Sequence, residues 1–185
     1  MPACEFKPTR ARRLAVALGF AAAFLVVDQL TKAVVRQSMV PGVTSIPVVP
    51  GILNLEYVRN LGAAFSLASG QGPLLVALAV IMVAASLAYL WRAPLISRLE
   101  AVGLGMLMGG AVGNAIDRAL FGFVTDFFAT QFIDFPVFNV ADIGITVGVA
   151  IAFLGFMFLS PANADARRRA EEDRARRTNR DDRGE

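Results

Sequence analysis

Long apolar stretches alternate with short polar segments along this chain, and four of the stretches are long enough to cross a membrane. A membrane-spanning helix needs about 20 mostly apolar residues. The candidate spans cover residues 14–35, 72–91 and 99–120, and a fourth begins near residue 139 and is uncharged from 143 to 164. The sequence therefore predicts an all-α membrane protein with four transmembrane helices.

The segment between the first two spans has a different pattern. Residues 46–58 are rich in β-branched side chains and are punctuated by Pro47, Pro50 and Gly51, which favours a short strand pair lying on the membrane surface. Residues 60–67 are expected to add one or two helical turns. We therefore expect a small external β/loop element between helices 1 and 2, whereas residues 121–138 are expected only as a connection between helices 3 and 4.

Basic residues mark one side of the predicted bundle. They lie before the first span, between the second and third, and after the fourth, within residues 7–13, 92–98 and 167–169. Because basic loops stay in the cytoplasm, this distribution predicts cytoplasmic termini. The first span continues through the polar residues Asp28, Gln29 and Lys32, so it is interpreted as a retained helix and not as a removed signal peptide.

Three parts of the chain follow from this layout. Residues 1–13 form a basic cytoplasmic N-terminus, and residues 14–160 form the four-helix membrane domain. Residues 161–185 carry eight Arg and seven acidic residues with almost no large apolar side chain, and are expected to be disordered or an exposed helix.

The composition excludes several chemistries. The chain has 185 residues, of which 56% are hydrophobic, and it has no histidine and one cysteine. Ser-His-Asp and Cys-His catalysis and the usual zinc sites are therefore excluded, and we expect no metal and no cofactor. Cys4 is interpreted as a free cytoplasmic thiol. The net charge of +3 resides mainly at the two ends, which favours membrane lipid over nucleic acid as a partner.

Small residues recur at four-residue spacing in the third and fourth spans, at Gly105, Gly109, Gly113, Gly144 and Gly148. This spacing lets helix backbones approach closely in lipid. We favour packing within one bundle over a dimer interface, and expect a monomer.

Charged residues within the spans need an explanation, because each costs roughly 2.5–3.5 kcal/mol near the centre of a membrane helix. Asp28 lies about 21 Å along the first span and Asp117 about 27 Å along the third, at 1.5 Å per residue. Asp142 begins the fourth span from the outside, and Asp126 lies in the connection just before it. All these polar groups therefore fall at one depth near the outer surface, which predicts a single site there.

Simpler interpretations exist for several of these residues. Asp28 and Lys32 have the spacing of an ion pair on one helix face. Asn139 and Asp142 fit a helix N-cap followed by an acid in the first turn. Asp126 lies among apolar and aromatic residues, where a carboxyl is expected to have a raised pKa, as a general acid requires. The remaining loop acids, Glu56 and Asp134, are interpreted as solvated charges.

Five polar blocks occur in order along the chain. They read VDQLTK at residues 27–32, NLGAAFS at 60–66, GAVGNAIDR at 110–118, VTDF at 124–127 and FNVAD at 138–142. Together they resemble the lipoprotein signal peptidase family, the type II signal peptidases of bacteria. The resemblance runs from the first span through the fourth.

This resemblance implies an aspartyl endopeptidase of the bacterial cytoplasmic membrane, with its active site at the external face. It would remove the signal peptide from prolipoproteins, cutting before a cysteine that carries diacylglycerol. Asp126 and Asp142 would be the catalytic pair. The matching substrate-binding or supporting positions are Asp28, Lys32, Asn60, Asn114, Asp117, Arg118 and Asn139.

Two carboxylates that share a proton can cleave an amide without histidine or metal. One takes a proton from water and the other donates one, and the pair titrates as a unit. We expect Asn114 and Asn139 to position these carboxylates or to bind the peptide backbone. We expect Arg118 to pair with Asp117.

Three other functions remain open at this point. A small transporter would use Asp28, Lys32 and Asp117 as an ion relay, but it predicts polar groups at the membrane midplane, which the second span lacks. A presenilin- or prepilin-type peptidase would carry a Gly-x-Gly-Asp motif, which this chain lacks. A non-catalytic assembly factor would leave the two aspartates without a joint role.

Overall fold

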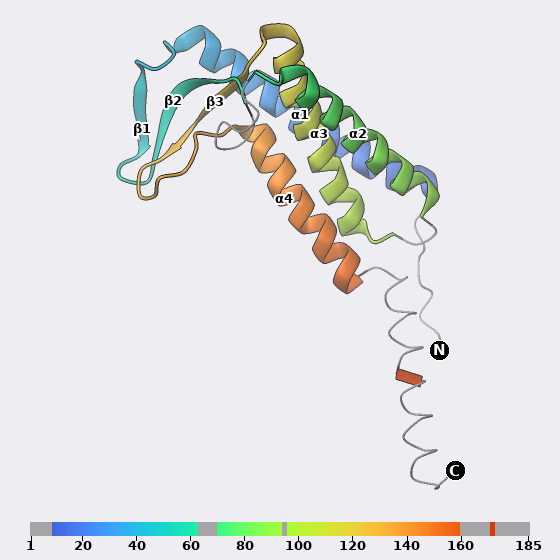
Figure 1. Cartoon of the computed structure of the whole chain (residues 1–185). Helices are drawn as coiled ribbons and strands as arrows, with labels where there is room; N and C mark the ends of the chain where they lie inside the picture. The colour runs from blue at the N-terminus through green and yellow to red at the C-terminus, as the bar shows by residue number, and fades with distance from the viewer. Residues whose placement is uncertain (1–8, 63–69, 94–95, 160–170, 173–185) are drawn as a thin grey trace, which may run out of the picture.

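Four long helices form a bundle with a small sheet at one end (Figure 1). The structure, a computed structural model, describes residues 9–62, 70–93, 96–159 and 171–172. The helices are α1 (Arg10–Ser38), α2 (Gly72–Arg92), α3 (Arg98–Phe121) and α4 (Val140–Leu154), the last continued by the π-helical segment η2 (Gly155–Leu159). All four helices, α4 together with η2, are long and apolar enough to cross a membrane, so the predicted spans are confirmed.

Helix α3 is the central element of the bundle and contacts α1, α2 and α4. Its apolar span is 67% buried, compared with 17% or less for the other three. A Cβ atom at Gly105 or Gly109 would collide with the backbone of α1, and one at Gly103 or Gly110 with the backbone of α4. The predicted packing of small residues within one bundle is therefore confirmed, and it explains how α3 fits between its neighbours.

Three antiparallel strands form the sheet, in the order β1 (Ser45–Val49), β2 (Leu53–Asn60) and β3 (Val124–Thr130). The predicted pair between helices 1 and 2 is confirmed as the β1–β2 hairpin. The third strand, which lies between α3 and α4, was not predicted. Strand β3 has only seven residues, and its pairing partner β2 is more than sixty residues away along the chain. Only the tertiary fold brings the two strands together.

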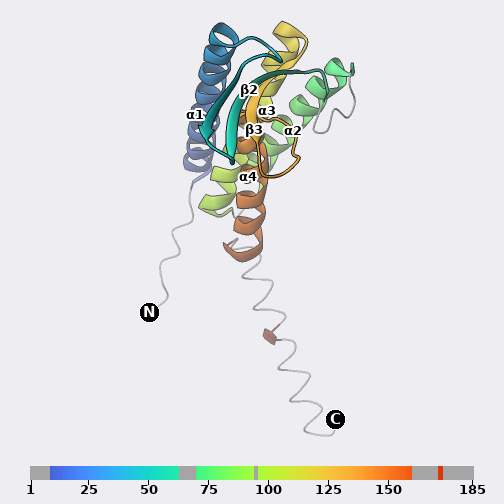
Figure 2. The same cartoon turned by 90° about the vertical axis from the view of Figure 1, so that its left-hand side faces the viewer.

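The sheet packs against the end of α1 through a small apolar core of Val35, Met39, Tyr57 and Phe127. In Figure 2 the strands lie across the end of the bundle between α1 and α2. We call this the sheet end. The predicted helical turns at 60–67 lie mostly outside the described residues, as do Cys4 and nearly all of the tail.

Polar groups also cap the opposite end of the bundle. Ser97 and Glu100 form a capping box at the start of α3, and the Tyr89 hydroxyl donates to Glu100 Oε2 at 2.6 Å. Arg13 donates to the carbonyl of Ala93 at 2.7 Å, which ties α1 to the end of α2. These contacts join neighbouring helix ends and leave the sheet end as the place where the predicted site residues gather.

Candidate active site

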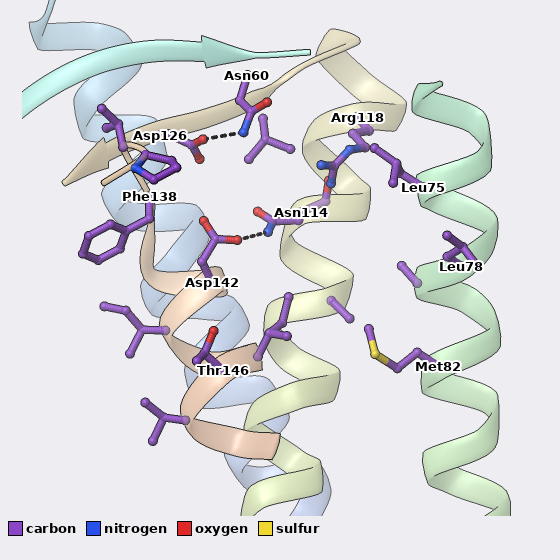
Figure 3. A pocket seen from close by; sticks show the side chains of 18 of the residues that line it. Asn60, Leu75, Leu78, Met82, Asn114, Arg118, Asp126, Phe138, Asp142 and Thr146 are labelled. Atoms are coloured by element: carbon purple, nitrogen blue, oxygen red, sulfur yellow. Dashed lines mark hydrogen bonds between the residues drawn. The ribbon is translucent and has the colours of Figure 1, made fainter. Parts of the chain in front are cut away.

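All nine residues predicted for the site lie at the sheet end and form one connected network of hydrogen bonds and ion pairs. They come from α1, the end of β2, α3, β3 and the start of α4. The convergence of polar groups expected from helix depth is therefore confirmed. Figure 3 shows the part of the network that faces the cleft.

Asp126 lies in the middle of β3 and is almost fully buried. Asn139 Nδ2 donates to its Oδ1 at 2.6 Å, and Asn60 Nδ2 donates to its Oδ2 at 2.9 Å. The Asn60 side-chain oxygen Oδ1 accepts from the Gly62 backbone N–H at 2.9 Å. This bond orients the side-chain amide so that its NH₂ group points toward Asp126. Both oxygens of this carboxyl are thus held by neutral amides.

The environment of Asp126 changes its proton affinity. Burial is the main cause and the nearby charge of Asp142 the second, and together they raise the pKa of Asp126 to about 7. The hydrogen bonds from Asn60 and Asn139 lower the pKa and partly oppose this rise. The expectation of a raised pKa is confirmed, and Asp126 is well placed to hold a proton near neutral pH.

Asp142 is positioned by the start of α4. Asn139 is the N-cap and accepts from Asp142 N at 3.0 Å, while Asp142 Oδ2 accepts from Asn139 N at 3.1 Å. The capping interpretation is therefore correct, and it does not compete with a role in the site. The same cap turns the Asn139 amide toward Asp126 and the Asp142 carboxylate toward the cleft, where it is partly exposed.

Asn114 on α3 connects the two carboxyl groups. Its Nδ2 donates to Asp142 Oδ1 at 2.8 Å, and its Oδ1 accepts from Asn139 Nδ2 at 3.2 Å. Lys32 Nζ also donates to that oxygen, at 2.8 Å. Since an ammonium group can only donate, Lys32 fixes the orientation of the Asn114 amide, and its NH₂ must point to Asp142.

A second pair of carboxylates lies just behind this arrangement. Lys32 Nζ is 2.9 Å from Asp28 Oδ2 and 3.5 Å from Asp117 Oδ2, and all three side chains are fully buried. The predicted Asp28–Lys32 ion pair is therefore present, as part of a larger cluster. Asp28 Oδ1 also accepts from Ala141 N at 2.9 Å, and a Cβ atom at Gly113 would collide with the Asp28 carboxylate. This glycine lets α1 bring a charged group into contact with α3 and α4.

The expected pairing of Arg118 with Asp117 is wrong. Neighbouring residues on a helix point about 100° apart, and Asp117 is engaged by Lys32 and by Arg36, whose Nη1 is 3.3 Å from Asp117 Oδ1. Arg118 instead lines the cleft and donates to the carbonyls of Gly62 at 2.7 Å and Asn114 at 3.3 Å. Its Nε is buried and has no hydrogen-bond partner among the described residues.

Sequence reasoning missed three members of the network. Gln29 donates to Asp28 Oδ2 at 3.1 Å and to the Gly113 carbonyl at 3.1 Å, and Arg36 donates to the Thr125 hydroxyl at 3.0 Å. Arg36 lies one helical turn after Lys32, so helical spacing could have identified it. Thr125 carried no such signal, because its partner comes from a distant part of the chain.

Two acids were expected to be solvated loop charges. Asp134 is exposed in the loop before α4, as expected, whereas the prediction is wrong for Glu56, which is half-buried on β2 and accepts from the Ser45 hydroxyl at 2.9 Å. Within the described ranges, no three acidic or cysteine side chains gather as a possible set of metal ligands.

A cleft of about 580 Å³ opens beside the two carboxyl groups. Asn60, Asn114, Arg118, Asp126 and Asp142 form its polar end (Figure 3). Its walls are largely apolar and come from α2, α3, α4 and the loop before α4, including Leu75, Leu78, Ala79, Met82, Phe135, Val137, Phe138, Ile143, Ile145 and Val147. An extended or helical apolar chain would therefore contact the walls while a polar bond lay near the carboxyl groups.

Comparisons with known proteins agree with this geometry. The family model described as signal peptidase (SPase) II matches residues 20–158. A lipoprotein signal peptidase of Trichormus variabilis is 43% identical over 137 residues, which are 73% of this chain and 85% of that protein. One of Geobacillus kaustophilus is 42% identical over 142 residues, or 76% of this chain and 92% of that protein.

Solved structures show the same fold. A bacterial membrane enzyme determined by the in meso method at 2.3 Å resolution has a TM-score of 0.72 and 31% sequence identity, over 77% of this chain and 88% of that one. The aspartic-type site, the four membrane-spanning helices and these matches lead to one conclusion. The chain is a multi-pass bacterial membrane protein that belongs to the signal peptidase II family of aspartic-type proteases.

Proposed function

We propose that this protein removes the signal peptide from diacylglyceryl-modified prolipoproteins by cutting before the lipidated cysteine, with Asp126 and Asp142 as the catalytic pair. One observation carries the proposal. Carboxyl groups from β3 and α4 are joined through the amides of Asn139 and Asn114 at the polar end of an apolar cleft. This arrangement supports acid–base chemistry on a peptide bond whose flanking chain is apolar.

The two carboxyl groups take different parts in the reaction. Asp126 is buried and its pKa is raised to about 7, which favours the protonated form and the role of general acid. Asp142 lies in the first turn of α4 and is partly exposed in the cleft, and it acts as general base. Asp142 removes a proton from water, the hydroxide attacks the carbonyl carbon, and Asp126 protonates the carbonyl oxygen. Collapse of the tetrahedral intermediate then needs a proton on the leaving nitrogen, which Asp142 returns, while the Asp126 carboxylate takes back the proton of one hydroxyl group. The C–N bond breaks, and both carboxyl groups return to their starting protonation states.

The supporting residues hold the pair in place. Asn114 and Asn139 keep the carboxyl groups at a fixed separation, and Lys32 holds Asn114 in the required orientation. Arg118 lies on the cleft wall and donates to the carbonyls of Gly62 and Asn114, which joins the segment after β2 to α3 beside the pair. These residues orient the reacting groups, which is a large part of catalysis in a preorganised site.

The lipid on the substrate provides binding energy away from the reacting bond. Each buried CH₂ of an acyl chain contributes about 0.8 kcal/mol, which anchors the cysteine at the membrane. The signal helix would then lie along the apolar faces of α2 and α4, with the scissile bond at the level of the two carboxyl groups. Binding at the remote acyl chains would thus position the peptide bond.

The test compares diacylated and unmodified forms of one precursor in the same bilayer, with the purified wild-type protein and the Asp142→Asn variant. We expect the wild type to cleave the diacylated form at the residue before the cysteine, with a much higher kcat/KM than for the unmodified form. Asp142→Asn should cleave neither. Equal kcat/KM for the two precursors would show that the lipid is not recognised. Cleavage by Asp142→Asn would show that Asp142 is not one of the catalytic pair.

We also propose that the sheet end faces the exterior, that both termini are cytoplasmic, and that the protein acts as a monomer. Five arginines at the opposite end support this orientation: Arg10, Arg12, Arg13, Arg92 and Arg98. Reporters fused between β2 and α2 and after Glu185 should lie on opposite sides of the membrane. The mass of the protein in detergent, measured by light scattering, would reveal an oligomer.

A further inference from the structure

Arg36 occupies the last turns of α1 and faces three elements of the fold. Its Nη1 donates to Asp117 Oδ1 at 3.3 Å and to the Thr125 hydroxyl at 3.0 Å. Its guanidinium lies over the ring of Phe121, 4.5 Å from the ring centre. One side chain thereby connects α1, the end of α3 and the beginning of β3.

Thr125 is held at two points by this arrangement. Its backbone N–H donates to Asp117 Oδ2 at 2.9 Å, while its hydroxyl accepts from Arg36. The residue is completely buried. The connection to it is short, since α3 ends at Phe121, the C-cap Gly122 has a φ of 78°, and β3 begins at Val124. Asp117 and Arg36 thus fix both the backbone and the side chain of the residue that precedes Asp126.

The ladder between β2 and β3 is interrupted directly after Asp126. The pairing of β2 with β3 is regular from Val58 to Asn60, which pair with Asp126, Thr125 and Val124, but it shifts between Leu55 and Val58, opposite Phe127. A bulge of this kind interrupts the ladder and lets the strand bend locally. Contacts outside the ladder therefore add to the support of β3 beside Asp126.

We propose that Arg36 is a positioning residue for the peptidase reaction, which acts by clamping Thr125 and Asp117 so that β3 presents Asp126 to the cleft. Successive side chains of a strand point to opposite faces, so fixing Thr125 against α1 and α3 determines which way Asp126 points. Arg36 lies outside the lining of the cleft and acts only through these two neighbours. The inference rests on the proposed function, in which Asp126 is the general acid.

The experiment measures kcat and KM for the diacylated precursor and, separately, amide hydrogen exchange of peptides that cover residues 122–130. Arg36→Met keeps the apolar stem and removes both hydrogen bonds, and Thr125→Val removes only the hydroxyl. Arg59→Met is the matched control, because Arg59 also lies over aromatic rings, those of Tyr57 on β2 and Phe123 just before β3, and is exposed.

We expect Arg36→Met to lower kcat about tenfold while KM stays within about twofold, since a small displacement of a reacting group slows the chemical step and leaves apolar binding unchanged. Exchange at residues 122–130 should be faster. Arg36→Lys, which retains a cation and one possible bond, should recover part of kcat. Thr125→Val should add little to Arg36→Met, because the two substitutions break the same contact.

Several results would overturn the inference: a kcat for Arg36→Met equal to that of Arg59→Met, a loss confined to KM, or full additivity of the two substitutions. Unchanged exchange in β3 would overturn it as well. If the wild type cleaves no lipidated precursor, the proposed function fails, and the exchange measurement still decides whether Arg36 holds β3. If Arg36→Met does not accumulate, Arg36→Lys and Thr125→Val provide the same readouts.

Discussion

Two pairs of carboxyl groups lie side by side at the sheet end, and their partners differ. Asp28 and Asp117 form ion pairs with Lys32 and Arg36, and we call these four residues the ion-paired cluster. Within the part of the chain that the structure describes, Asp126 and Asp142, the amide-held pair, accept side-chain hydrogen bonds only from Asn60, Asn114 and Asn139.

This difference in partners indicates that the two pairs have different roles, one in holding helices together and one in the proposed reaction. The ion pairs of Lys32 and Arg36 on α1 with Asp117 on α3 join two helices, so the ion-paired cluster is suited to fixing helices. Amides hold a carboxyl group in place without neutralising its charge. The amide-held pair can therefore exchange protons, and Asn114, which contacts both Lys32 and Asp142, connects the two regions.

The largest effect should follow from Asp126→Asn and Asp142→Asn. Each retains the side-chain volume and removes the ionisable group, so cleavage should fall by at least about three orders of magnitude, in the range expected for loss of a catalytic acid or base. Initial rates with a diacylated precursor measure this, and thermal unfolding in detergent checks that the fold persists. The exposed Asp134→Asn serves as control. Substantial activity in either variant would show that the amide-held pair is not the reactive one.

In the ion-paired cluster the main effect should be on stability. Lys32→Met leaves Asp28 and Asp117 buried without their shared cation, and breaking a buried ion pair in this way costs about 3–5 kcal/mol. The thermal midpoint and the accumulation of the protein in membranes should fall, whereas Arg59→Met should change neither. A Lys32→Met protein of normal stability would contradict the structural role assigned to the cluster.

Asn114→Ala tests the link between the two regions. The substitution removes the donor to Asp142 and the acceptor for Lys32, so we expect kcat to fall about 100-fold, the size associated with a small misplacement of a reacting group. KM should change much less, because the apolar walls of the cleft are intact. A loss of stability without a loss of kcat per folded molecule would place Asn114 with the ion-paired cluster alone.

The pH dependence distinguishes the members of the amide-held pair. Asp126 loses its proton as the pH rises through about 7, so kcat/KM should fall above that pH, by about tenfold per unit, if Asp126 is the acid. Asn60→Ala removes a hydrogen bond that lowers this pKa, and should move the alkaline limb to higher pH. If the alkaline limb of the pH profile does not move in Asn60→Ala, that limb reports the ionisation of a group other than Asp126.

The sequence by itself determined the parts of this protein that depend on local pattern. Four apolar stretches of sufficient length must form helices in lipid, because only a helix lets each backbone N–H and C=O group of such a segment form a hydrogen bond within the segment. The capping box of Asn139 and Asp142 and the ion pair of Asp28 and Lys32 are also local, since their partners lie three or four residues apart. Helix depth then predicted correctly that the polar residues converge at one end.

The tertiary structure decided what depends on contacts between distant segments. Strand β3 exists because β2, far away in the chain, offers a pairing edge, and this strand places Asp126 beside Asn139. The partner of Asp117 could not be deduced either, because Arg118 is its neighbour in sequence while Lys32 and Arg36 reach it from another helix. Spacing along one helix identifies which side chains share a face, but only the packing of α1 and β3 against α3 selects which charges and amides come within bonding distance.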